Sequence, residues 1–345
     1  MSEGRTTVRL PSGEHAIWAY AAGYFLAYVP YGLVTKALSE GRLPGAPERV
    51  AGLALLPIST AVSAIGMLVF LGASGLWKLA PSVRVAGITI PVPRRATLLS
   101  GVCTAAIVLT TTLAYTFEGT SIVAMMLMMR GGVLVIAPIV DLVSRRRVRW
   151  YSWIGLGLSA LALGDALLGA LDARIAPPAL LDVAVYLGAY FVRLRLMSRL
   201  AKSEPDASHR YFVEEQLVAT PIALAVIVAV ALLDRGAVGA TLAHGLVDLP
   251  RSGALGWVVL IGLCSQATGI FGALVLLDAR ENTFSVPVNR ASSILAGVLA
   301  TALLAWLLGG ATPDRGELIG AALVVLAIVV LALGPRIDQR RAAST

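Results

Sequence analysis

The sequence predicts an all-α polytopic membrane protein with ten transmembrane helices, arranged as two inverted five-helix repeats. Three observations support this fold class. The 345 residues are 57% hydrophobic and only 14% charged, with a mean hydropathy of +0.82, which fits neither a soluble globule nor a disordered chain. Apolar stretches long enough to cross a hydrocarbon core of about 30 Å follow one another along the chain. The sequence also repeats itself at an offset of about 160 residues.

The predicted helices lie near residues 15–38, 52–76, 96–117, 120–143, 151–171, 179–200, 212–233, 254–277, 284–308 and 316–334. A polar segment precedes the first of them and lacks a small-residue cleavage site, so we expect no removable signal peptide. The predicted organisation is therefore a cytoplasmic N-terminal segment, a first repeat, a second repeat and a cytoplasmic tail, at residues 1–14, 15–172, 173–335 and 336–345.

The internal repeat matches positions of each half in chain order. The matches are Tyr20-x-x-x-Tyr24-Phe25 with Tyr186-x-x-x-Tyr190-Phe191, Lys36 with Lys202, Pro57-Ile58 with Pro221-Ile222, Gly101-Val102-Cys103 with Gly262-Leu263-Cys264, and Met129-Arg130 with Asn289-Arg290. They include residue types that are rare in apolar segments, such as cysteine and a mid-segment arginine. Five helices per unit is an odd number, so the second copy must enter the membrane from the opposite side and the repeat is inverted.

The distribution of basic residues predicts that both termini are cytoplasmic. In this topology most lysines and arginines face the cytoplasm, and the arginines outside are Arg42, Arg49, Arg174, Arg235, Arg251 and Arg315. The net charge of +8 then reflects orientation and attraction to anionic headgroups, so the expected partner is the lipid bilayer and not nucleic acid. The preference for arginine over lysine and the abundance of Ala, Gly and Pro are typical of a GC-rich bacterial genome. This composition indicates the inner (cytoplasmic) membrane.

We expect no cofactor and no metal. Cys103 and Cys264 occupy equivalent mid-membrane positions and are interpreted as packing residues. The three histidines, His15, His209 and His244, lie at segment ends or in loops without a partner at metal-ligand spacing.

Ionisable residues inside the apolar stretches are the candidates for function, because burying a charge in a membrane costs several kcal/mol unless it faces a cavity or a partner. Arg130 and Arg290 lie deep in their stretches and correspond across the repeat. The alternative for both is a structural ion pair with Glu118 or Glu215. Lys36, Arg193 and Arg195 lie nearer the ends of their apolar stretches. For these three, extension of the side chain to the membrane interface is at least as good an interpretation as a functional role.

Further polar residues extend this candidate site. Tyr24, Tyr28 and Tyr31 are spaced by about one helical turn and either line a cavity or pack between helices. Glu214, Glu215 and Gln216 open the stretch 212–233 and either anchor it or contact the substrate. Asp165 is interpreted as solvated or paired with Arg174. No carboxylate lies between Glu14 and Glu40, which argues against the small multidrug pumps, whose site is a glutamate in the first helix.

The chain resembles the drug/metabolite transporter superfamily over about residues 15 to 335. The resemblance rests on the five-plus-five arrangement and on the endings of the two units, Arg146-x-x-Arg149-Trp150-x-x-Trp153-x-Gly155 and Pro313-x-x-Gly316-Glu317-x-x-Gly320. Within the EamA-like and nucleotide-sugar-transporter-like branch, Thr283 to Arg290 is similar to the Asn-Lys motif of the ninth helix, and Tyr211 to Pro221 to the Asn-Asn motif of the seventh. Here Glu215-Gln216 stand in place of Asn-Asn, and Arg290 in place of Lys.

The resemblance and the buried arginines predict a secondary transporter that works by alternating access on a small polar or anionic metabolite, with a phosphorylated or nucleotide-linked sugar as one candidate. Arg290 with Asn289 is expected to bind a phosphate or carboxylate, because a guanidinium offers a fork of donors to such oxyanions. The full set of candidate substrate-binding residues is Arg290, Asn289, Arg130, Lys36, Tyr28, Glu215 and Gln216.

Two alternatives stay open. One is an exporter of amino acids or cationic drugs with the same fold. The other is a membrane-embedded transferase that holds a phosphorylated lipid through Arg145-Arg146-Arg147. The loops contain no cluster of Asp, Glu or His residues, which argues against a transferase. We therefore expect no enzyme activity. The sequence is compatible with a homodimer.

Overall fold

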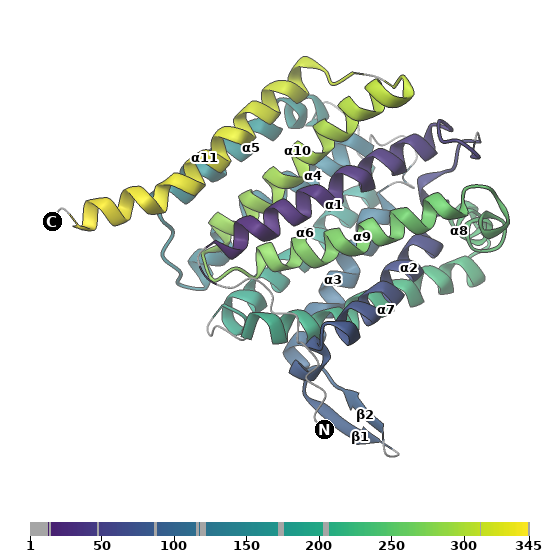
Figure 1. Cartoon of the computed structure of the whole chain (residues 1–345), viewed down its shortest axis with the longest axis horizontal. Coiled ribbons are helices and arrows are strands. Elements are labelled where there is room, and N and C mark those ends of the chain that lie inside the picture. Colours follow the sequence, from purple (N-terminus) through teal and green to yellow (C-terminus); the bar gives the residue numbers. More distant parts are fainter. Residues whose placement is uncertain are drawn as a thin grey trace, which may run out of the picture.

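The computed structural model describes residues 13, 15–46, 48–85, 88–114, 117, 122–171, 176–202, 207–310 and 312–343. Long helices form most of it (Figure 1). These are α1 (Ala16–Ser39), α2 (Gly52–Ala73), α3 (Arg95–Leu113), α4 (Ile122–Val143), α5 (Trp150–Leu171), α6 (Pro177–Leu200), α7 (Ala207–Leu233), α9 (Leu255–Leu276), α10 (Asn282–Leu308) and α11 (Arg315–Ala343). Each overlaps one of the predicted apolar stretches.

Within the described residues, eight of these helices are long and apolar enough to cross a membrane, namely α1, α2, α3, α4, α7, α9, α10 and α11. The prediction of an all-helical polytopic membrane protein is thereby confirmed in its coarse form. The helices α5 and α6 have 22 and 24 residues but are not among the eight, and the side chains of residues 165–171 of α5 lie outside the described part of the chain. Side chains of α6 include the ionisable residues Asp182, Arg193, Arg195 and Arg199, which lower its hydropathy.

Several short elements were not predicted. A hairpin of β1 (Ser82–Val85) and β2 (Ile88–Pro91) follows the 3-10 helix η1 (Leu76–Leu79) and projects beyond the helices (Figure 1). The helix α8 (Ala237–Val247) and the 3-10 helix η2 (Leu249–Arg251) connect α7 to α9. With 11 residues, α8 is too short to span a bilayer, and it packs on α2 and α7.

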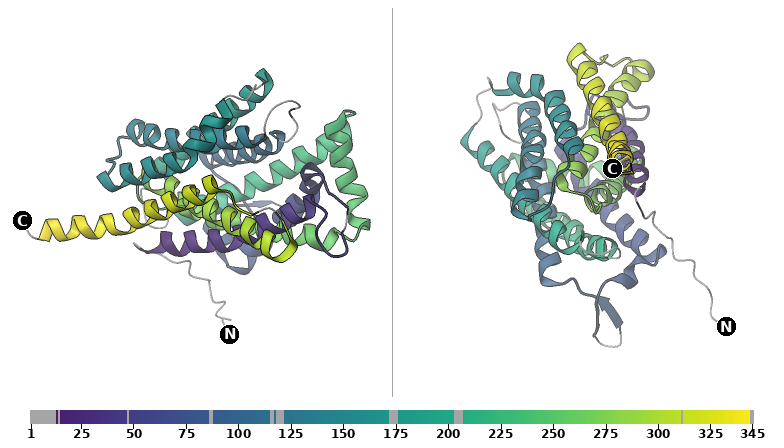
Figure 2. Two further views of the ribbon diagram at one scale, coloured as in Figure 1. Left: turned by 90° about the horizontal axis from the view of Figure 1, so that it is seen from above. Right: turned by 90° about the vertical axis from the view of Figure 1, so that its left-hand side faces the viewer.

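The last helix is longer than the predicted apolar stretch 316–334. Helix α11 continues through Pro335 to Ala343 and extends away from the other helices (Figure 2). Residues 336–343 include Arg, Gln and Ala, which are strong helix formers. The Trp150 indole Nε1 donates a hydrogen bond of 2.8 Å to Asp338, which attaches this extension to the start of α5.

The helices pack in pairs that involve both halves of the chain. Helix α1 packs on α9 and α10, and α6 packs on α3 and α4. Likewise α2 packs on α9, and α7 on α3. Two glycines permit close approach in the last two pairs. A Cβ at Gly262 would lie 2.8 Å from the Ser59 carbonyl oxygen of α2, and one at Gly101 would lie 3.1 Å from the Glu215 carbonyl oxygen of α7.

Candidate functional site

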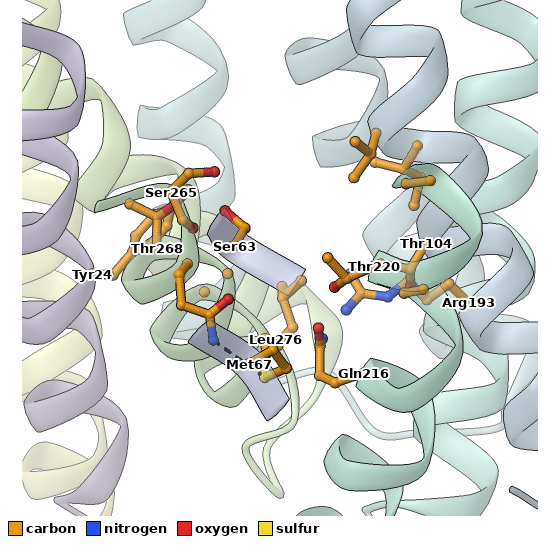
Figure 3. Close-up of a pocket in the computed structure, with 18 of the residues that line it drawn as sticks. Tyr24, Ser63, Met67, Thr104, Arg193, Gln216, Thr220, Ser265, Thr268 and Leu276 are labelled. Carbon is orange, nitrogen blue, oxygen red and sulfur yellow. Dashed lines mark hydrogen bonds between the residues drawn. The ribbon is translucent and has the colours of Figure 1, made fainter. Parts of the chain in front are cut away.

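A cavity of about 290 Å³ lies among the helices, lined by residues of α1, α2, α3, α6, α7, α9 and α10. Its lining combines apolar side chains with uncharged polar ones. Figure 3 shows one wall of side chains facing another across it: Thr104, Arg193, Gln216 and Thr220 on one side, and Tyr24, Ser63, Ser265 and Thr268 on the other. The charged residues that line the cavity are Arg193 and Arg290, and no described Asp or Glu side chain lines it.

The first half of α10 carries Arg290 to this cavity. Every residue from Asn282 to Ser293 is buried, so this segment runs through the interior although it contains several polar side chains. Arg290 is buried, with an exposed fraction of 7%. Its Nη2 donates a hydrogen bond of 2.9 Å to the Tyr190 hydroxyl, and its Cζ lies 5.4 Å from the centroid of the same ring. This places a buried cation against an aromatic ring and its hydroxyl group.

No described carboxylate lies within ion-pair distance of Arg290, and its buried Nε has no hydrogen-bond partner among the described residues. A buried guanidinium normally has a hydrogen-bonded counter-ion. Arg290 therefore retains an unused donor and an unneutralised charge at the cavity wall.

Arg130 forms a similar contact in the other half of the chain. Its Nη2 donates a hydrogen bond of 3.2 Å to the Tyr28 hydroxyl. The Tyr28 ring packs edge-on between Tyr24 and Tyr31, with centroids 5.5 Å from each. Arg130 does not line the cavity, and no described carboxylate forms an ion pair with it.

Glu215 forms an ion pair with Arg193. The Arg193 Nε and Nη2 donate hydrogen bonds of 2.9 and 2.8 Å to the two carboxylate oxygens. Both side chains are buried, with exposures of 0% for Glu215 and 6% for Arg193. Thr104 and Ser100 donate further hydrogen bonds to Glu215. Of the two carboxylates considered as structural partners for Arg130 and Arg290, Glu215 is thus occupied by Arg193.

The other considered partner, Glu118, and the side chain of Asp165 lie outside the described residues. Arg193 does not extend to the interface, because Glu215 compensates its charge in the interior. The structure thus gives Arg193 a role that the sequence reasoning did not foresee. The sequence carried only a partial signal for this role, because Glu215 needed a basic partner and the neighbouring stretch 179–200 supplied three candidates, Arg193, Arg195 and Arg199.

The remaining predicted site residues divide into two groups. Asn289 and Gln216 line the cavity with Arg290, and Asn289 donates a hydrogen bond of 3.3 Å to the Gly272 carbonyl oxygen. Lys36 and Tyr28 do not line it. Lys36 is exposed near the end of α1, and Tyr28 reaches the site only through its neighbour Tyr24.

A second polar cluster was missed by the sequence reasoning. The buried carboxylate of Asp141, near the end of α4, accepts hydrogen bonds of 2.7 to 2.9 Å from the backbone N–H groups of Asn282 and Thr283 and from both of their side chains. It therefore caps the N-terminus of α10, where the helix dipole favours a negative charge. The available signal was that Asp141 is the lone carboxylate of the apolar stretch 120–143.

Comparison with known proteins shows that solved structures share the fold of this chain. No family model and no curated protein matches the chain. Among solved structures 28 chains match. One, described only as the crystal structure of a protein, is 16% identical with a TM-score of 0.61, and the match covers 94% of this chain and 99% of the other. At this identity the likeness concerns the fold alone.

Proposed function

We propose that this protein is a secondary transporter of the drug/metabolite transporter superfamily that moves a small polar or anionic metabolite across the cytoplasmic membrane by alternating access. The observation that carries the proposal is the buried Arg290 guanidinium at the cavity wall, without a carboxylate partner among the described residues. A phosphate or carboxylate of the substrate would supply the missing partner. A phosphorylated or nucleotide-linked sugar belongs to this class.

The cost of burying the Arg290 charge favours a site that binds an anionic ligand over an arginine without a partner. An arginine inside a membrane protein costs several kcal/mol unless it is paired or reaches water. Tyr190 offers a single hydroxyl oxygen, whereas an oxyanion would accept two parallel hydrogen bonds from the guanidinium fork. Asn289 and Gln216 line the same cavity and would orient the polar remainder of the substrate.

Three features of the packing support an inverted repeat of ten helices, with α5 and α6 as the two further crossings. Four pairs of helix contacts keep the same pattern when the halves are exchanged: α1–α9 with α6–α3, α1–α10 with α6–α4, α2–α9 with α7–α3, and α4–α5 with α10–α11. The corresponding glycines Gly101 and Gly262 each lie against a backbone carbonyl of a facing helix. The corresponding arginines Arg130 and Arg290 each donate to a tyrosine on the first helix of their own half.

The alternative substrate class is a cation, and the charge of the lining argues against it. An exported drug or amine would need a carboxylate or an aromatic cage, and the described lining contains arginines but no Asp or Glu. A transferase would need acid–base groups in the cavity, for which the described lining has no His, Asp or Glu candidate.

The proposal is tested by a thermal-stability screen of the purified protein in detergent. A ligand that binds only the folded state raises the apparent melting temperature. The panel contains phosphate esters, nucleotide sugars, dicarboxylates, zwitterionic amino acids and quaternary amines. We expect stabilisation by one of the anionic groups, followed by uptake of that compound into proteoliposomes. Stabilisation and transport of amines alone would reject the anion assignment.

A further inference from the structure

The polar cluster around Asp141 also contains a lysine. We call it the gate cluster and define it as Asp141 of α4, Ser198 and Lys202 at the end of α6, and Asn282 and Ser285 of α10. One helical turn of α10 separates Ser285 from Asn289, which lines the cavity. The predicted topology places the cluster on the cytoplasmic side.

The gate cluster connects the two halves of the chain. The Asn282 side-chain amide donates to Asp141 at 2.8 Å and to Ser198 at 2.7 Å, and its oxygen accepts a hydrogen bond of 3.0 Å from Lys202. One amide thus joins a carboxylate of the first half to an ammonium of the second. Movement of α10 away from α4 and α6 would break these contacts together, so the cluster couples the start of α10 to both helices.

The surroundings of Lys202 suit two protonation states. Its Nζ lies 2.9 Å from the Arg280 carbonyl oxygen, 3.0 Å from Asn282 Oδ1 and 3.3 Å from Ser285 Oγ. An ammonium donates to all three oxygens. A neutral amine donates to the first two and accepts from the Ser285 hydroxyl, which can reverse its role. Neither state leaves a polar group unpaired.

The charges facing Lys202 come from three segments. Asp141 lies on α4, Arg146 on the α4–α5 connection, and Asp278 and Glu281 on the α9–α10 connection. Desolvation by burial, followed by repulsion from Arg146, lowers the pKa of Lys202 to about 7, and the three carboxylates offset only part of that shift.

The corresponding lysine of the first repeat has a different environment. Lys36 matches Lys202 in the repeat and is exposed near the end of α1. Positions 122 and 125, which correspond to Asn282 and Ser285 at the same offset of about 160 residues as the arginines, are Ile122 and Met125 and offer no side-chain oxygen. The polar gate is therefore a feature of one side of the transporter.

We propose that Lys202 is a proton-binding site within a gate at the cytoplasmic end of the cavity, so that cytoplasmic protons favour the open gate. The gate rests on the proposed alternating-access function, whereas the proton site does not. An open gate would return Lys202 to water, where an ammonium is far more stable than in the closed cluster.

The sign of the effect follows from linkage. The proton binds more tightly to the open state than to the closed state, in which the pKa of Lys202 is about 7. Below this pH Lys202 is protonated in both states and the equilibrium is independent of pH. Above it, closing releases a proton, and each further pH unit favours closure by at most about tenfold until the open-state pKa is reached.

The first experiment observes the proton site directly. The chain contains three lysines, Lys36, Lys78 and Lys202, so lysine labelled with ¹³C at Cε gives three signals in an NMR titration of the protein in nanodiscs. We expect one signal to titrate near pH 7 and to be absent in Lys202→Met. Lys36→Met and Lys78→Met assign the other two signals. If no lysine signal titrates between pH 6 and 8.5, the proton site is rejected.

The second experiment measures the gate. A single cysteine replaces Ala273, a buried residue that lines the cavity on α9, in a protein with Cys103→Ala and Cys264→Ala. An impermeant thiol reagent is applied from the cytoplasmic side between pH 6 and 9. Rates are divided by those of the same protein with Lys202→Met, which removes the intrinsic pH dependence of the thiol. Lys36→Met serves as the matched control.

The expected result is a ratio that falls as the pH rises above 7, with no change in the Lys36→Met control. A titrating Lys202 with a pH-independent ratio would overturn the link between proton and gate. If the cysteine is never labelled from the cytoplasm at any pH or with substrate present, alternating access fails instead, and the NMR titration still decides the proton site.

Discussion

Arg193 and Glu215 form a doubly hydrogen-bonded ion pair beside the cavity, with N–O distances of 2.9 and 2.8 Å. This pair changes the charge balance of the site, because it neutralises the carboxylate closest in sequence to the lining residue Gln216. Arg290 is then left as the lining cation without a described acidic partner. Arg193 is paired with a carboxylate and Arg290 is not, so substitutions of the two arginines should have different effects.

Removing one member of the Arg193–Glu215 pair should destabilise the protein. Glu215→Leu leaves a buried guanidinium without its counter-ion, at a cost of about 3–5 kcal/mol, whereas the double variant Arg193→Met/Glu215→Leu should recover most of this loss. Denaturant unfolding in detergent measures both, with the exposed Arg195→Met as the control. Equal destabilisation by the single and double variants would show that the charge pairing is not what stabilises this region.

Arg290→Ala should abolish ligand-induced thermal stabilisation while the protein stays folded and monodisperse. The reason is that the substrate anion loses its guanidinium partner, whereas no described carboxylate is left unpaired. Arg290→Lys should retain part of the effect, since it keeps a point charge but loses the bidentate fork. The measurement is the melting temperature with and without ligand. An unchanged affinity in a destabilised Arg290→Ala protein would identify Arg290 as structural.

Arg130→Ala should slow transport in proteoliposomes if the two repeats act together. Its guanidinium is held by Tyr28, and Tyr28→Phe should have a smaller effect, because it removes only one hydrogen bond worth about 1 kcal/mol. Initial uptake rates of the identified substrate measure both variants, with Arg195→Ala as a control. A wild-type rate in Arg130→Ala would restrict the mechanism to the second half of the chain.

The topology is tested by labelling single cysteines in a protein whose two native cysteines are replaced. Cysteines at Ser144 and Ala343 should react only from the cytoplasm, and one at Ala240 only from outside, because the arginine and lysine asymmetry places both termini inside. Impermeant reagents applied to intact cells and to inverted vesicles distinguish the two faces. Labelling of Ala240 and Ala343 from the same face would reject both the ten-helix count and the inverted repeat.

The sequence by itself determined where the long helices lie. In a membrane each helix satisfies its own backbone hydrogen bonds, so a local run of apolar residues is enough to specify it. For that reason the ten predicted stretches overlap the ten long helices. The end of α11 and the helix α8 lie outside the predicted stretches, because helix propensity and packing, and not a long apolar run, specify them. The depth of Arg130 and Arg290 within their stretches was readable in the same way.

Only the tertiary structure decided which polar groups meet. Glu215 lies on α7, and nothing in its own segment selects Arg193 of α6 over Arg130 of α4 or Arg290 of α10. Asp141 meets the start of α10 across about 140 residues of chain, and Lys202 gains its low pKa only when those same elements enclose it. Such pairings depend on the rotation and contact of helices distant in sequence, and the apolar pattern of a membrane helix carries little information about either.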